Sequence, residues 1–286
     1  MTAMKPSDID IEKITFSSIK TLDNGGKMLY LNYGQGMNPI YVKSPEVEIP
    51  FDPTYYPDNE DSGKYAIKFS MKDLDNNTAM QEFHHMMVSM DEHLIKKAGE
   101  NSQPWFKKNK LSTETLNELY TPMVKVSKDP ETGEPNGKWP DSFGFKVVKR
   151  DGKFKDFSIY DTKGVEFDVN GVTENPTDIS KLLVKGSLIK VVLKCNGIWI
   201  ANGKFGCTWR AEQVRIKVPE GGLREFAILS DSEDEVDDEK SRDPVAANLV
   251  EDSTDEEEEK EEPEPKPPVE KVKKSRKVKV KKPTSQ

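Results

Sequence analysis

The C-terminal end of the chain separates negative from positive charge in a way that a packed domain does not allow. Residues 231–264 hold 18 acidic and three basic side chains, whereas residues 265–286 hold nine basic and one acidic side chain. All 24 aromatic residues lie within the first 230 positions. Like charges repel one another, and a segment without aromatic side chains buries too little apolar surface to offset its conformational entropy. The sequence therefore predicts a folded part that ends near Leu229, a disordered acidic tail over 230–264 and a disordered basic terminus over 265–286.

Composition also excludes several classes of protein. Hydrophobic residues make up 34% of the 286 positions and charged residues 33%. No apolar run approaches the roughly 18 residues that a membrane span needs, and the N-terminal sequence MTAMKPSDID lacks the hydrophobic region of a signal peptide. Two cysteines, Cys195 and Cys207, are too few for a disulfide framework and fit a reducing compartment. We expect an intracellular protein that is neither secreted nor embedded in a membrane.

Residues 1–120 are predicted to form a β-rich segment with two helices that packs on, or precedes, a barrel. Short apolar runs broken by turn residues predict strands, and the sequence Asp23-Asn24-Gly25-Gly26 is typical of a hairpin turn. The longer helix is expected at about 78–98 and the shorter one at 113–120. One apolar face of the longer helix is formed at helical spacing by Met80, Phe83, Met87, Met90 and Leu94.

Residues 121–229 are predicted to be almost entirely β, with one short helical bridge at 177–183. The dipeptides Asn196-Gly197 and Asn202-Gly203 are expected to be turns between strands. The expected strands cover 123–128, 143–149, 153–161, 164–170, 187–195, 198–201 and 204–218. We predict a mostly β fold with a few helices: an OB-fold-like antiparallel barrel over 121–229, with an N-terminal β/α extension and a disordered C-terminal tail.

Motifs for catalysis, metals and cofactors are incomplete in this sequence. Glu82 and His85 have the E-x-x-H spacing of di-iron helices, but the second such motif is missing. The cysteines do not form a C-x-x-C zinc motif, and Gly34-Gln35-Gly36 lacks the third glycine of a dinucleotide-binding loop. We therefore predict no catalytic residue, no metal and no cofactor, and we do not expect an enzyme.

Basic residues alternate with aromatic ones in two parts of the β-rich half. Single-stranded nucleic acid is bound by this combination, because cations follow the phosphates while aromatic faces stack on unpaired bases. The candidate nucleic-acid-binding residues are Lys146, Lys149, Arg150, Lys153, Phe154, Lys190, Lys194, Trp199, Lys204, Phe205, Trp209 and Arg210. Aromatic residues on strands also form barrel cores, so for each aromatic candidate both interpretations stay open.

The alternation along 205–217 predicts one binding face. Phe205 and Trp209 share their parity with Arg215 and Lys217, whereas the aliphatic residues Val214, Ile216 and Val218 have the other parity. Because neighbouring side chains of a strand point to opposite faces, this pattern predicts an aromatic and cationic face opposite an aliphatic one. A β-bulge near Ala211 would exchange the two faces midway.

The charged C-terminal segments suggest interactions of their own. The acidic tail can compete with DNA for a cationic groove or recruit basic partner proteins, such as replication or repair proteins. The basic run 271–282 can bind phosphates or act as a nuclear import signal. Acidic residues follow four phosphorylation candidates at the spacing that acidophilic kinases prefer: Ser230, Ser232, Ser253 and Thr254.

Four stretches of the folded region carry a family resemblance: KGSLIKVVL at 185–193, IWI at 198–200, GKFGCTW at 203–209 and Gln213-Val214. They resemble the single-stranded DNA-binding proteins of nucleocytoplasmic large DNA viruses, of the African swine fever virus type. The resemblance implies an OB-fold core that binds unpaired DNA during replication, without catalysis. It also implies that the groove side carries Lys190, Trp199, Lys204, Phe205, Trp209 and Arg210.

The leading hypothesis is a viral protein that binds single-stranded DNA independently of sequence during replication, recombination or repair. One alternative is a non-catalytic scaffold or chaperone whose acidic tail binds basic proteins, and another is an RNA-binding protein. The expected location is the host nucleus or a viral replication factory, with packaging in the virion as a further option. The oligomeric state is left open.

Overall fold

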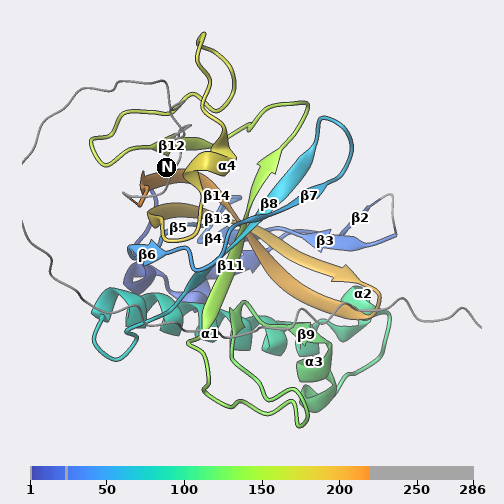
Figure 1. Ribbon diagram of the computed structural model, residues 1–286. Helices are drawn as coiled ribbons and strands as arrows, with labels where there is room; N and C mark the ends of the chain where they lie inside the picture. The colour runs from blue at the N-terminus through green and yellow to red at the C-terminus, as the bar shows by residue number, and fades with distance from the viewer. Residues whose placement is uncertain (1, 23–24, 220–286) are drawn as a thin grey trace, which may run out of the picture. The chain divides into compact units, whose positions relative to one another are not determined.

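The computed structural model describes residues 2–22 and 25–219 (Figure 1). The acidic tail, the basic terminus and the expected turn at Asp23-Asn24 lie outside these residues. So do the phosphorylation candidates Ser230, Ser232, Ser253 and Thr254. Among the described residues, no helix is both long enough and apolar enough to cross a membrane.

Five strand positions form the central barrel. The first is shared by β5 (Tyr41–Lys43) and β6 (Val47–Glu48), and the others are β8 (Gly63–Ser70), β11 (Ser142–Lys149), β13 (Leu188–Ala201) and β14 (Lys204–Lys217). β8 pairs with β11, β11 with β14, β14 with β13, and β13 with β5 and β6, while β6 lies against β8. The short helix α4 (Ile179–Leu182) precedes the fourth strand position. This five-stranded Greek-key order confirms the predicted OB-like fold.

Two details of the barrel differ from the sequence-based prediction. The pairing of β11 with β14 is parallel, through Lys146 and Arg210, because a long connection separates these strands in the chain. In addition, strands from both sides of residue 120 share one sheet, since β5, β6 and β8 pair with β13 and β11. A boundary at residue 120 therefore runs through the barrel.

Smaller elements surround the barrel. β7 pairs with β8, β10 with β11, and β12 and β9 with β14, whereas β2 and β3 extend the sheet beyond β13. These elements are β1 (Ile14–Phe16), β2 (Lys20–Thr21), β3 (Lys27–Leu29), β4 (Leu31–Tyr33), β7 (Thr54–Pro57), β9 (Tyr120–Thr121), β10 (Val124–Lys125), β12 (Ser158–Tyr160), the 3-10 turns Pro6–Asp8 and Ile11–Lys13, and the helices α1 (Thr78–Glu100), α2 (Ser102–Phe106) and α3 (Thr113–Leu119). The strand expected at 164–170 is absent apart from a bridge between Tyr160 and Glu166.

The expected turn at Asn196-Gly197 is instead a bulge inside the fourteen-residue strand β13. The register passes from the pair Cys195–Trp209 to the pair Gly197–Thr208, so Asn196 has no cross-strand partner. Gly197 has φ of 104°, and a Cβ atom there would lie 2.0 Å from the carbonyl oxygen of Leu29. The second expected turn is confirmed, because Asn202 and Gly203 both have positive φ between β13 and β14.

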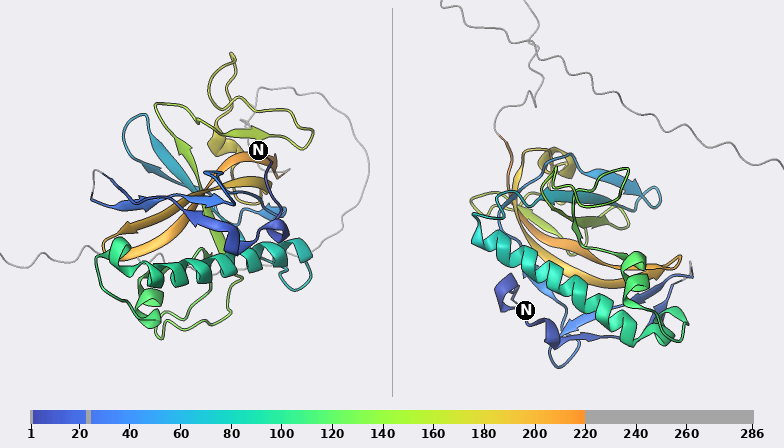
Figure 2. Two further views of the ribbon diagram at one scale, coloured as in Figure 1. Left: turned by 180° about the vertical axis from the view of Figure 1, so that it is seen from behind. Right: turned by 90° about the horizontal axis from the view of Figure 1, so that it is seen from below.

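Helix α1 packs against the end of the barrel at which β8 ends and β11 begins (Figure 2). It starts at a cap in which the side chain of Asn77 accepts a hydrogen bond from the Met80 amide. Phe83 packs against Phe69 of β8 and Phe143 of β11. The predicted apolar face is confirmed, because Met80, Phe83, Met87, Met90 and Leu94 are all buried.

Candidate nucleic-acid interface

The outer face of β8 and β11 carries the side chains that the barrel core leaves outside. Along β11, Phe143, Phe145 and Val147 are buried, so the residues between them point outward. Gly144 of β11 pairs with Lys68 of β8. The short strand β10 adds Lys125 beside Ser142 at the start of β11. Three segments that are distant in sequence therefore meet on one face.

A groove of about 290 Å³ runs over this face. One wall is formed by residues 121–125, and the floor includes Gly144, whose missing side chain leaves space between the strands. We call this hollow the lysine groove, because its lining includes Lys68, Lys125, Lys146, Trp199 and Thr208. Lys146 and Trp199 belong to the set that the sequence predicted, and so does Trp209, which also borders the groove.

Within residues 2–22 and 25–219, the three lysines of the groove have no carboxylate partner. Among the described residues, none of Lys68, Lys125 and Lys146 lies within ion-pair distance of an acidic side chain. Burial lowers the pKa of Lys125, and the nearby charge of Lys68 lowers it further against the opposing effect of Asp91. Burial is also the main reason that the pKa of Lys146 is lowered. An anion in the groove would offset the burial of both lysines and the repulsion between Lys68 and Lys125.

Trp199 provides an aromatic surface beside the lysines. Its indole is half-buried and lies over Gly206 of β14. A Cβ atom at Gly206 would approach Cζ2 of Trp199 to 3.1 Å and the carbonyl oxygen of Thr121 to 2.9 Å. The glycine thus leaves room for the indole to approach the strand. A partly exposed indole next to lysines that lack a carboxylate partner among the described residues has the chemistry of a site that stacks a base and binds its phosphate.

The hairpin of β7 and β8 and the segment just before it add exposed aromatic residues that the sequence reasoning missed. Phe51 is 69% exposed and Tyr56 is 50% exposed, and Tyr56 pairs with Lys64 across the hairpin. Lys64 itself pairs with Asp58 at 3.1 Å. For Lys64 and Lys68, which the sequence reasoning also missed, the available signal was the alternation of lysine with aromatic residues in KYAIKFSMK at 64–72.

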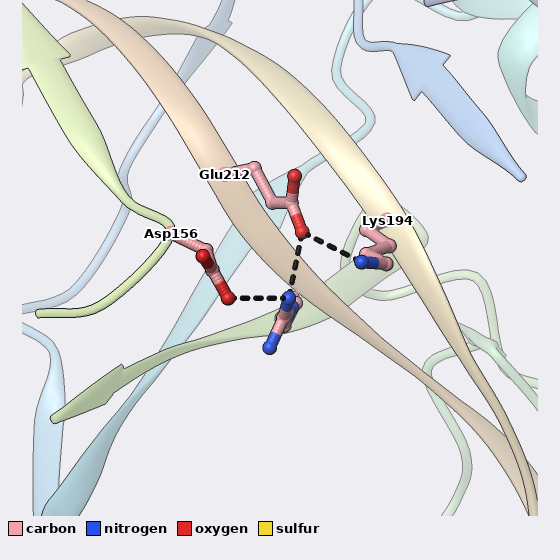
Figure 3. A network of polar contacts seen from close by, with 4 residues as sticks. Asp156, Lys194 and Glu212 are labelled. Atoms are coloured by element: carbon pink, nitrogen blue, oxygen red, sulfur yellow. Dashed lines mark hydrogen bonds and ion pairs between the residues drawn. The ribbon is translucent and has the colours of Figure 1, made fainter. Parts of the chain in front are cut away.

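Two predicted cations, Lys194 and Arg210, are neutralised by acidic side chains (Figure 3). Nη2 of Arg210 lies 2.7 Å from Oε1 of Glu212 and 3.4 Å from Oδ2 of Asp156. Nζ of Lys194 lies 3.1 Å from the same Glu212 oxygen and also faces the ring of Tyr41. These cations are therefore not free in the way that those of the lysine groove are.

Three predicted aromatic contacts belong to the core instead. Phe205 is 0% exposed, Trp209 is 1% exposed and Phe154 is 7% exposed, so none of them offers a face to a base. Phe205 packs between Phe106 and Tyr120. The Nε1–H group of Trp209 points to the sulfur of Met123 at 2.9 Å.

The prediction of an aromatic and cationic face on β14 was wrong, because the strand contains a bulge. Val192 pairs with Gln213 and Leu193 with Ala211, so Glu212 has no residue opposite it on β13. The extra residue exchanges the two faces of the strand. Phe205 and Trp209 therefore point to the same side as Val214 and Ile216, which is the buried one.

The remaining predicted cations do not line the lysine groove. Lys149 ends β11, and Arg150 forms the turn that follows it, bridged to Lys153. Lys190 is exposed opposite Arg215, and Lys204 is exposed beside the turn between β13 and β14. Their roles in binding stay predictions.

A buried carboxylate holds the wall of the groove in place. Asp91 of α1 accepts hydrogen bonds from the Tyr120 hydroxyl and the Met123 amide, which lie just before Lys125. Burial raises the pKa of Asp91 to about 6, against the opposing effect of these hydrogen bonds. Asp91 thus positions the segment that carries Lys125.

Stability is expected to depend on pH through Asp91. The folded pKa of about 6 lies above the unfolded value of 3.8, so this group stabilises the fold fully below pH 3.8, and that stabilisation is lost as the pH rises through 6. Relative to Asp91→Asn, the wild type should lose on the order of 2–3 kcal/mol of unfolding free energy between pH 4 and pH 7. Urea titrations of both proteins at several pH values measure this difference. A constant difference would contradict the buried, raised carboxyl.

Other chemical groups of the described region do not form a metal site. No group of three or more histidine, cysteine, aspartate or glutamate side chains in this part of the chain could hold a metal ion. His84 pairs with Asp141 at 3.0 Å, and the sulfur atoms of the free cysteines Cys195 and Cys207 lie 3.4 Å apart in the core.

Comparisons with known proteins give solved structures but no family. No family model matches the chain, and neither does any curated protein. Gp2.5, a single-stranded DNA-binding protein of bacteriophage T7, is 16% identical with a TM-score of 0.38, over 65% of this chain and 91% of its own. The single-stranded DNA-binding protein of bacteriophage Enc34, in complex with single-stranded DNA, is 13% identical with a TM-score of 0.38, over 73% and 98%. Because these TM-scores are below 0.5, the fold assignment rests on the strand pairing described above. The functional argument rests on the surface of this chain.

Proposed function

We propose that this protein binds single-stranded DNA, largely independently of sequence, through the lysine groove. The observation that carries this proposal is the set of three lysines without carboxylate partners in the described part of the chain, beside a partly exposed tryptophan, on the outer face of an OB-like barrel. OB-folds use the face of their second and third strands for oligonucleotides, and β8 and β11 are those strands here.

The arrangement favours a single strand over a duplex. Stacking on Trp199 needs a base whose face is uncovered, whereas the bases of a duplex already stack on their neighbours. The lysines follow the backbone, which all sequences share, so the base itself is not read. A role in viral replication, recombination or repair, with partner proteins bound by the acidic tail, is part of the same proposal.

A salt titration tests the proposal with the full chain. Fluorescence anisotropy of a labelled strand of about 30 nucleotides is measured between 0.05 and 0.2 M salt. Three lysine contacts predict a slope of about −2 for the logarithm of the association constant against that of the salt concentration, because each phosphate contributes about −0.7. Duplex DNA and RNA serve as competitors. Tighter binding of RNA would favour the RNA-binding alternative, and absence of binding would favour the acidic-tail scaffold.

A further inference from the structure

A row of three cations crosses the strands next to the lysine groove. Lys146 of β11 pairs in register with Arg210 of β14, and Arg210 pairs with Lys194 of β13. Lys146 has no acidic partner among the described residues, whereas the other two are held by Glu212 and Asp156 (Figure 3). The free positive charge therefore stops between two neighbouring strands.

The two carboxylates are held differently. Glu212 has a side chain 18% exposed, sits at the bulge of β14 and binds both Lys194 and Arg210. Asp156 has a side chain 70% exposed and makes one ion pair, to Arg210 at 3.4 Å. It lies in the connection between β11 and β12 with φ of 57°. Asp156 is thus an accessible counterion, whereas Glu212 is a fixed one.

Beyond Asp156 the surface changes its charge. A hollow of about 880 Å³ opens there, and among the described residues its lining includes the carboxylates Asp156, Glu166 and Glu212 but only one cation, Lys43. A DNA backbone that follows the unpaired lysines would meet acidic side chains if it continued across Arg210. The three cations therefore lie side by side, but the charges of Arg210 and Lys194 are neutralised.

We propose that Asp156 is an internal counterion that occupies, on Arg210, the place of a DNA phosphate, and that it thereby sets the end of the strand path. This inference rests on the proposed single-stranded DNA binding. A carboxylate and a phosphate accept the same guanidinium hydrogen bonds, so a phosphate that binds Nη2 of Arg210 would compete with Asp156 for that group. A DNA phosphate can then contact Arg210 only when it displaces Asp156. The DNA-binding site is therefore shorter than the row of cations.

The test compares two substitutions in the full chain that change the net charge equally. Asp156→Asn removes the counterion, whereas Asp151→Asn removes a carboxylate that pairs with Lys155. Both aspartates have positive φ, 57° and 51°, which asparagine tolerates, so neither change strains the backbone. Asp156→Asn should tighten binding of a 30-nucleotide strand about two- to fivefold at 0.05 M salt, the range expected for one exposed ion pair. Its salt slope should become steeper by about 0.7 because one more phosphate is neutralised.

Arg210→Gln tests whether the effect passes through this arginine. In that background, Asp156→Asn should change the affinity and the salt slope no more than Asp151→Asn does. Equal effects of the two aspartate substitutions in the wild-type background would overturn the assignment of Asp156 while leaving single-stranded DNA binding intact. Absence of binding by the wild type would instead overturn the proposed function. Matching far-ultraviolet circular dichroism and melting temperatures ensure that all variants compared are folded.

Discussion

Replacing Lys68, Lys125 and Lys146 together by glutamine is expected to weaken single-stranded DNA binding about a hundredfold at 0.1 M salt. At this salt concentration each phosphate contact contributes about 0.7 logarithmic units through counterion release, so three contacts contribute about two. The salt slope should become shallower by about 2 for the same reason. Anisotropy titrations of the full chain measure both quantities.

A second triple variant controls for the loss of charge. Lys96, Lys163 and Lys181 are exposed and lie outside the lysine groove, so their replacement by glutamine removes the same three charges elsewhere. This variant should keep most of the affinity. If both variants bound DNA equally weakly, net charge would explain the effect, and if both bound like the wild type, the basic terminus at 265–286 would become the stronger candidate.

Trp209→Ala is expected to destabilise the folded protein by about 3–5 kcal/mol. The indole is 1% exposed, contacts Phe143 at a ring distance of 6.4 Å and donates its N–H toward Met123. Removing it leaves a large cavity under the lysine groove, which the rigid sheet cannot fill. Urea unfolding gives the free energy directly. A variant as stable as the wild type would contradict the core position of this residue.

Trp199→Ala should weaken DNA binding and leave the stability of the fold almost unchanged. Its half-buried indole lies on the surface over Gly206, so the substitution opens no comparable cavity. If one base stacks there, its loss weakens DNA binding by about 1–3 kcal/mol. The melting temperature should change little. A large fall in melting temperature without a specific loss of affinity would assign Trp199 to the core as well.

Patterns of residues close together in the sequence were sufficient to predict much of the fold. The helical spacing from Met80 to Leu94 predicts α1, and the turn at Asn202-Gly203 predicts the hairpin of β13 and β14. Both features are decided by residues close together in the chain. The bulges at Asn196 and Glu212 lie in the register of β13 against β14, which the residue types of this hairpin do not reveal, and one extra residue is enough to exchange the faces of a strand.

The candidate site was less predictable for the same reason. Lys146 and Trp199 stand out in the β-rich half, but Lys68 and Lys125 become their neighbours only through the pairing of β8 and β10 with β11. Phe205 and Trp209 looked equally suitable until the register placed them in the core. Residue types indicated the chemistry of the interface, whereas long-range register decided which residues form it.

The closure of the barrel also determines when the binding face comes into existence. Its first position is supplied by β5 and β6 and its last by β14, so the ends of the ring are separated by most of the described chain. Contacts between residues so far apart in sequence form late, because the entropy cost of closing a long loop comes before the favourable contacts are made. During synthesis one edge of β11 stays uncovered until β14, residues 204–217, has left the ribosome, whereas β8 is already flanked by β7 and β11. A chain released earlier would carry Lys68, Lys125 and Lys146 but no groove to hold them together.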